Sequence, residues 1–343
     1  MKSQAEKNQT NFEKLSNRVE NFRLQKVEAC RLADLYEKIN PSKAVRLRNC
    51  SSFLAFAKGV DGFVLKQINS CRVRLCPLCT ARRSHKLFLQ LQKVTNALAC
   101  EGYRFIFLTL TVKNVNYNEL KPTLDNMLKA YNKLLKKTQF SRAICGAFRS
   151  LEVVHDCNKV VTRDMYYGNA EKHIYSRRGY YDKIGVYVGD SNPNFKKFHP
   201  HFHVLLAVDK SYFTNPKKYI KQSDFVEMWQ NCLSADYEPV CDVRVLKGDI
   251  QTALQEVSKY TVKSADILPV DTFLASEVVE VLDQVLACRR LVSFNGVFKE
   301  VHKALNLVDI EQDDLSDDDI TPVNEPLLVY RWISGFQNYY VEE

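Results

Sequence analysis

Three short apolar segments constrain the fold of this chain most strongly. They are FIFLTLTV at 105–112, AFRSLEVVH at 147–155 and HFHVLLAV at 201–208. Their length and apolar content are typical of strands, and the last two could pair as antiparallel neighbours. Apolar residues at helical spacing, such as Leu120, Leu124 and Met127, predict helices around them. Because strands and helices mix without a steady βαβ period, we expect an α+β fold.

Charge divides the chain into a basic body and an acidic end. The 343 residues carry a formal net charge of +9, but residues 309–343 hold ten acids and one base, Arg331, which leaves +18 on residues 1–308. A long basic body suits a polyanionic partner, because lysine and arginine displace counterions from phosphates. A solubilising surface is the alternative that charge alone leaves open.

Composition also divides the chain into regions. We expect a helical polar arm at 1–45, a cysteine-rich unit at 46–100, a core at 101–270 with a polar insertion at 158–198, a helical extension at 271–308, an acidic linker at 309–326 and a C-terminal docking segment at 327–343. The first residues contain no apolar region of the signal-peptide type, and no apolar run approaches the roughly 20 residues that cross a bilayer. These features predict a cytoplasmic protein without membrane insertion.

Two histidines on one strand form the first candidate site. The strand period of two sends His201 and His203 to the same face, where their imidazoles could chelate one divalent ion. Glu152 lies within the apolar strand SLEVV, where a carboxylate is costly unless it is paired or bound to metal. We therefore expect Glu152 as the third ligand, with a solvated sheet face as the alternative. His199, beside Pro200, is not counted as a ligand.

A helix with a tyrosine forms the second candidate site. In QEVSKYTVKS, the residues Glu256, Tyr260 and Lys263 lie at i, i+4 and i+7, so one helical face presents an acid, a phenol and an amine. A phenol becomes a useful nucleophile toward phosphate when cations and a metal lie close to it. An ordinary amphipathic helix is the alternative, and only partnership with the histidines favours catalysis.

Four of the eleven cysteines indicate a structural metal site. Cys50, Cys71, Cys76 and Cys79 are separated by 20, 4 and 2 residues, and the first residues predict a reducing compartment. This spacing predicts a tetrahedral zinc site, with free core cysteines as the alternative. The short C-x-x-C could also be a redox motif, but no thioredoxin-like βαβ pattern surrounds it.

Two groups of basic residues are candidates for contact with a phosphate backbone. Arg82, Arg83 and Lys86 follow the last cysteine of the zinc site. Arg177 and Arg178 lie in the insertion among several tyrosines, a mixture that could bind phosphates and stack bases. A solvated helix start and a solubilising loop are the respective alternatives.

Taken together, these residues resemble the HUH endonuclease superfamily, and most closely its plasmid rolling-circle replication initiators with one catalytic tyrosine. The resemblance rests on His201-Phe202-His203, FLTLTV, SLEVV, CPLCTARRS and RLVSFNGVFKEVHKAL, in matching order over roughly residues 46–308. The glutamate four residues before Tyr260 also fits the family pattern. The insertion between Asp156 and His199 is longer than the turn expected for the family.

The resemblance implies a central antiparallel sheet flanked by helices, and a nick in origin DNA that depends on Mg²⁺ or Mn²⁺. It implies strand transfer by Tyr260, which leaves a 5′-phosphotyrosine and a free 3′-OH primer, and water activation by Glu256 at termination. Single- and double-stranded origin DNA, a host helicase and a polymerase are then the expected partners, and a homo-oligomer is an open possibility. The alternatives are a transposase or conjugative relaxase of the same superfamily, a metal hydrolase, and a noncatalytic zinc-stabilised DNA-binding protein.

Overall fold

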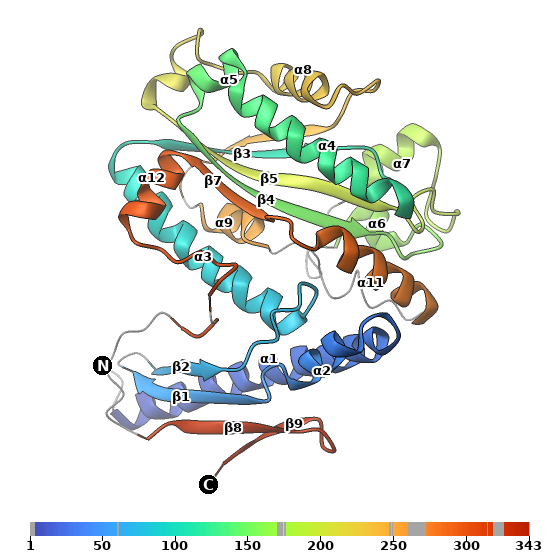
Figure 1. Ribbon diagram of the computed structural model, residues 1–343. Helices are drawn as coiled ribbons and strands as arrows, with labels where there is room; N and C mark the ends of the chain where they lie inside the picture. Colours follow the sequence, from blue (N-terminus) through green and yellow to red (C-terminus); the bar gives the residue numbers. More distant parts are fainter. Residues whose placement is uncertain are drawn as a thin grey trace.

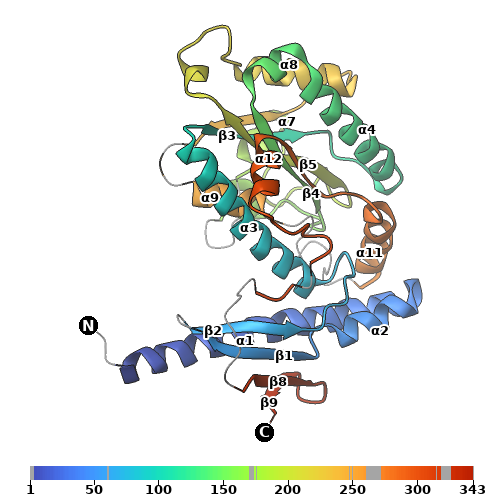
Figure 2. The same ribbon diagram turned by 60° about the vertical axis from the view of Figure 1, so that its left-hand side comes forward.

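The structure is a computed structural model built around two antiparallel sheets (Figures 1 and 2). It describes residues 4–59, 62–169, 174, 176–246, 248, 250–259, 272–313, 315–317 and 326–342. The larger sheet has five strands in the order β6-β3-β5-β4-β7, and every neighbouring pair is antiparallel. Its strands are β3 (Arg104–Thr111), β4 (Gly146–His155), β5 (Phe198–Val208), β6 (Cys241–Val245) and β7 (Val292–Gly296). The expected α+β class with a central antiparallel sheet is therefore confirmed.

Helices cover both faces of the five-stranded sheet (Figure 1). One face carries α4 (Tyr117–Lys136), α5 (Thr138–Ala143) and α8 (Gln222–Leu233). The other carries α3 (Pro77–Cys100), α9 (Gln251–Val257) and α12 (Val297–Ala304). On the first face, Phe202 of β5 packs against Tyr131 and Trp229, with ring centroids 5.6 and 6.2 Å away. Because side chains alternate along a strand, His201 and His203 point to the second face.

The smaller sheet joins segments that are far apart in the sequence. Its order is β2-β1-β8-β9, from β1 (Phe53–Gly59), β2 (Gly62–Ile68), β8 (Leu328–Ile333) and β9 (Asn338–Val341). Phe53 lies opposite Arg331 in the β1–β8 register. The segment at 327–343 thus supplies strands to a sheet that begins near the N-terminus (Figure 2).

The first residues form long packed helices. Helix α1 (Gln4–Ile39) contacts this small sheet, α3 and α11 (Thr272–Leu286), and α2 (Pro41–Asn49) folds back along it. Tyr36 of α1 is fully buried and donates a hydrogen bond of 2.6 Å to Asp283 of α11. The stretch that the sequence predicts as a polar arm therefore contributes to the protein core.

The insertion at 158–198 has a small core of its own. It contains α6 (Arg163–Tyr167) and α7 (Arg178–Ile184), and Val161, Met165, Tyr166 and Tyr181 pack together. The strands on either side of it still pair, with His155 opposite Phe198. A short 3-10 helix, η1 (Lys210–Phe213), follows β5. The insertion at 158–198 therefore leaves the pairing register of β4 and β5 intact.

Candidate functional site

Three side chains meet on the sheet face toward α3 and α9. In the β4–β5 register Glu152 lies opposite His201, and His203 follows on the same face. Glu152 Oε2 is 2.9 Å from His203 Nε2 and 3.3 Å from His201 Nε2, and the two Nε2 atoms are 3.1 Å apart. These three buried residues, here called the metal triad, could hold one metal ion, because their ligand atoms lie within 4.8 Å of one another.

The electrostatics of the metal triad suit a divalent cation. Burial lowers the pKa of His203, which favours the neutral imidazole needed for ligation. Burial also raises the pKa of Glu152, but hydrogen bonds to the two histidines outweigh this and hold it well below its usual value. A carboxylate with two imidazoles is a donor set for a divalent cation.

His201 is oriented by its neighbours. Its Nδ1 lies 3.2 Å from the backbone oxygen of His199, an acceptor that leaves Nε2 for a metal. The His199 ring hydrogen-bonds through Nδ1 to Asn114 Oδ1 at 2.7 Å. Burial lowers the pKa of His199 to about 3, so this ring stays neutral near pH 7. His199 thus lies beside the metal triad and not within it.

Glu256 of α9 lies directly behind His203. Its Oε1 is 3.9 Å from His203 Nδ1 and 3.3 Å from Arg244 Nη2, and only 7% of the residue is exposed. Arg244 comes from β6 and also holds Asp242 at 2.8 Å. The carboxylate is therefore fixed between an imidazole and a guanidinium, close to the place where a metal would bind.

A cavity of about 550 Å³ opens over the metal triad. Three basic residues from different elements line it, namely Arg177, Arg244 and Lys259. Arg177 also forms an ion pair of 2.9 Å with Asp156, which lines the same cavity. A cavity with a carboxylate–histidine cluster on its floor and cations on its wall fits a phosphodiester backbone.

Two of the predicted catalytic residues lie outside the described part of the chain. The structure describes the chain through Lys259 and again from Thr272, so Tyr260 and Lys263 have no described placement. Of the predicted catalytic residues, only Glu256 is therefore located, beside the metal triad.

The four predicted zinc ligands converge in the core. Cys50 ends α2, and Cys76 and Cys79 lie at the start of α3, close to Cys71. Sγ–Sγ distances of 3.6 to 3.7 Å separate Cys50 from Cys79 and Cys76, and Cys71 from Cys79. Four thiolates bound tetrahedrally at about 2.3 Å from zinc would lie about 3.8 Å apart. The cluster therefore fits a zinc ion in size and ligand type.

The surroundings of the cysteine cluster suit a bound cation. Burial raises the pKa of Cys76, whereas hydrogen bonds with the other three thiols lower that of Cys79. Lys26 of α1 is fully buried, and its Nζ donates hydrogen bonds to the backbone oxygens of Arg48 and Cys50. Its charge would partly balance a zinc ion with four thiolates, which carries a net charge of −2.

The basic residues predicted to contact DNA lie in two different settings. Arg82, Arg83 and Lys86 are only 7, 4 and 3% exposed, so they are not on the open helix start that the sequence predicts. Segment 309–317 covers part of this helix, and its carboxylates pair with Arg82 and Lys86. By contrast, Arg178 lies at the surface and pairs with Asp182.

Arg244 is the site residue that the sequence analysis missed. Its guanidinium lies 4.5 Å from the ring centre of Phe107 and contacts Glu256. The signal was present in PVCDVRVL, where Asp242 and Arg244 alternate with the apolar positions of the strand. An alternating strand places such residues on one face, but which face meets the histidines depends on strand pairing.

Comparison with known proteins gives a consistent result. Residues 62–340 match the family model Rep_1, described as "Replication protein". The chain is 32% identical to a Protein rep of Lactiplantibacillus plantarum over 95% of this chain and 96% of the relative. It is 32% identical to a Protein rep of Bacillus amyloliquefaciens, over 87% of this chain and 84% of the relative. A Protein rep of Streptococcus pneumoniae is 30% identical to the chain, over 94% of this chain and 92% of the relative.

No solved structure is significantly similar to this chain. Within the described residues, no helix has the length and apolar character to span a membrane.

Proposed function

Because this chain belongs to the Rep_1 family of plasmid replication proteins, which act in rolling-circle replication, we propose that it nicks origin DNA by metal-dependent transesterification through Tyr260. The observation that supports this most is the placement of Glu256 and the metal triad around one cavity. Tyr260 directly follows Lys259, which lines that cavity. The proposed base and ligands thus line one cavity, and the proposed nucleophile is the next residue in the sequence after one of the lining residues.

In the proposed reaction, the Tyr260 hydroxyl oxygen bonds to the scissile phosphorus and the bond to the 3′ oxygen breaks. The phenol loses its proton, and the departing 3′ oxygen gains one. Glu152, His201 and His203 would hold Mg²⁺ or Mn²⁺, whose contribution is polarisation of the phosphate. One phosphodiester is exchanged for another, so the released 3′-OH is ready for extension by a polymerase.

The cations around the cavity fit this chemistry. Arg177, from the insertion, and Arg244, from β6, both line the cavity, and Lys259 directly precedes Tyr260 in the sequence. Positive groups that surround a phosphate stabilise the negative charge that develops as the bond is exchanged. Lys263, three residues beyond Tyr260, would favour the phenolate in the same way.

The direct test is capture of the covalent product. The chain is incubated with Mn²⁺ and single-stranded origin oligonucleotides that carry a label at either end, and the products are separated on a denaturing gel. We expect the 3′-labelled fragment to migrate with the protein and the 5′-labelled fragment to be free and extendable by a polymerase. EDTA should abolish both products. Cleavage without a protein-bound fragment would favour a metal hydrolase instead.

Replacement of Glu256 with alanine should separate nicking from termination. The variant loses the carboxylate that would activate water, so the adduct should persist while hydrolytic release slows by about 10²- to 10⁴-fold. Gln255→Ala, an exposed neighbour on the same helix, is the matched control. The measurement is the ratio of adduct to released strand over time. Equal release by the variant and the control would contradict this role of Glu256.

A further inference from the structure

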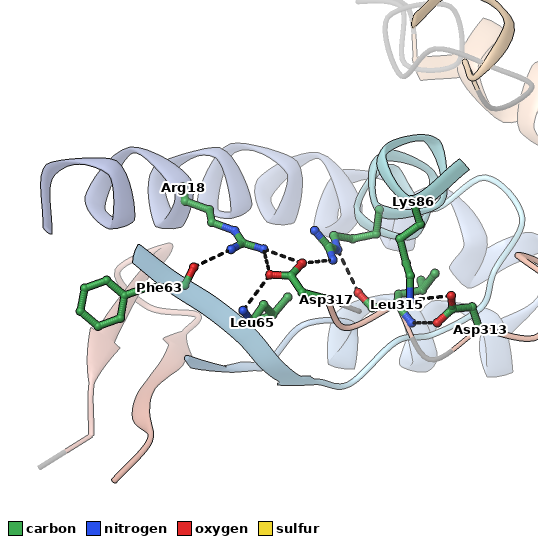
Figure 3. A network of polar contacts seen from close by, with 8 residues as sticks. Arg18, Phe63, Leu65, Lys86, Asp313, Leu315 and Asp317 are labelled. Atoms are coloured by element: carbon green, nitrogen blue, oxygen red, sulfur yellow. Dashed lines mark hydrogen bonds and ion pairs between the residues drawn. The ribbon is translucent and has the colours of Figure 1, made fainter. Parts of the chain in front are cut away.

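A second charged site lies where an acidic segment packs along α1 and α3 (Figure 3). We call residues 309–317 the acidic strap; Asp314 is outside its described part. Arg18 of α1 donates two hydrogen bonds to the Asp317 carboxylate at 2.9 and 3.0 Å, and Arg82 of α3 donates another at 2.7 Å. The Leu65 backbone N–H also donates to Asp317, at 2.8 Å. Groups from three elements, α1, β2 and α3, thus bind the Asp317 carboxylate.

The same pattern continues along the rest of the strap. Lys86 pairs with Asp313 at 2.5 Å, and both side chains are less than 10% exposed. Arg82 Nε donates to the backbone oxygen of Leu315 at 2.9 Å. The remaining described acids of the strap, Asp309 and Glu311, pair with Arg290 and Arg74. Each described carboxylate of the strap therefore meets a base from elsewhere in the chain.

A cleft of about 670 Å³ opens beside the Asp317 end of the strap. It lies between α1 and α3, and four basic or imidazole side chains line it, namely Arg18, Arg82, His85 and Lys86. Asp317 is the one carboxylate among its lining residues. The cleft shares no lining residue with the cavity of the metal triad. It is therefore a separate, predominantly basic surface.

The contacts of the strap resemble those of a bound phosphate backbone. Arginine binds carboxylate and phosphate with the same paired donors, so a phosphate group could take the place of Asp317. Both apolar side chains of the described strap, Ile310 and Leu315, are buried in the core, and its described acids are all ion-paired. Ion pairs with buried partners stabilise a fold poorly compared with apolar packing. A polyanion could therefore compete for the ionic anchors Asp313 and Asp317, whereas Leu315 between them would also have to leave its apolar contacts.

We propose that the cleft between α1 and α3 binds the phosphates of duplex DNA, which displace the Asp313–Asp317 end of the strap. This rests on the proposed function, because origin DNA is the partner. Duplex DNA fits better than a single strand because its higher charge density favours exchange with carboxylates. The carboxylates of the strap then compete with phosphates for the basic side chains of the cleft. Weakly binding polyanions are therefore excluded, and the duplex binds only when several of its phosphates contact the cleft at once.

Hydrogen–deuterium exchange of the full chain tests this directly. Duplex DNA is added without free Mg²⁺ or Mn²⁺ and without a chelator, so that no cleavage occurs and the cysteine cluster keeps its ion, and exchange is followed in peptides that contain 313–317 and Leu65. Displacement should increase exchange in both, because the Leu65 N–H loses its carboxylate acceptor. DNA that merely covers the strap would slow exchange there. Slower or unchanged exchange at saturating duplex would overturn the proposal, and a single strand that acts equally well would overturn the choice of duplex.

A charge substitution at Asp317 provides the second test of the proposal. The Asp317→Asn variant should bind duplex DNA about tenfold more tightly at low salt, because Arg18 and Arg82 become available for phosphates. The slope of log affinity against log salt concentration should also become steeper by about two. Asp34→Asn is the matched control, because it removes the same charge from α1, at an exposed ion pair with Arg48 of α2. Adding Arg82→Gln should cancel the gain. Equal affinities of the Asp317 and Asp34 variants would contradict the proposal.

The two arms also separate this inference from the catalytic proposal. Thermal melting shows whether the Asp317 variant is folded, and the exchange experiment on the unaltered chain decides the matter if it is not. A covalent adduct on single strands with no movement of the strap would contradict only the inference. Absence of any binding to duplex DNA would contradict the inference even where nicking is intact.

Discussion

Replacing Tyr260 with phenylalanine is expected to abolish the covalent protein–DNA adduct and to lower the rate of nicking by at least about 10⁴-fold. The substitution removes one oxygen, which is the atom that would bond to phosphorus. Affinity for origin DNA should change little, because the metal triad and the cations of the cavity are untouched. The measurement is single-turnover cleavage of a labelled oligonucleotide with Mn²⁺, alongside anisotropy for binding.

A matched control keeps this result specific. Tyr237→Phe removes a hydroxyl that accepts a hydrogen bond from the Lys113 backbone, outside the set of residues that line the cavity. It should nick at nearly the normal rate. An adduct that persists in the Tyr260 variant, mapped by mass spectrometry to another side chain, would show that the nucleophile is misassigned.

Loss of Cys76, one of the four proposed zinc ligands, should have the largest effect on stability. Structural zinc sites contribute on the order of 10 kcal/mol to folding, and three thiols cannot hold the ion as four do. Cys76→Ser should therefore fail to hold the ion and melt at a much lower temperature, because the cluster joins the end of α2, the start of α3 and the segment that contains Cys71. Colorimetric zinc release and circular dichroism measure both effects.

Cys100→Ser is the control for the zinc prediction, because this thiol is exposed at the end of α3. It should retain one zinc per chain and melt normally. Prolonged treatment with a strong chelator should reproduce the Cys76 phenotype in the unaltered chain. A Cys76 variant that keeps its full zinc content, or an unaltered chain purified without zinc, would contradict the assignment.

The local parts of the fold and site were predictable from the sequence. Alternation within HFHVLLAV requires His201 and His203 to share a face, and the structure places them there. The third member, Glu152, depended on pairing between two strands separated by a long insertion. The pairing holds because the insertion buries its own apolar residues and returns the chain at Phe198, opposite His155. The length of an insertion matters less than whether it folds by itself.

Long-range charge pairing could not be predicted in the same way. Arg82 and Lys86 follow a cysteine motif at a helix start, a local pattern that indicates an exposed basic edge. Their partners, Asp317 and Asp313, come more than 220 residues later. The acidic run itself has the composition of a solvated linker. Sequence patterns report on neighbours along a helix or strand, whereas these pairs exist only after distant elements have packed.

The pairing of β1 with β8 has a consequence for synthesis of the protein. During translation β1 and β2 emerge from the ribosome early, whereas the strand that covers the other edge of β1 is made some 270 residues later. Until then β1 carries an open edge with unpaired N–H and C=O groups, which is prone to pair with other chains. Prematurely terminated or proteolytically shortened chains keep that edge open. The open edge of β1 is thus covered only after β8 has left the ribosome, and the four-stranded sheet is complete only with β9, which ends at Val341.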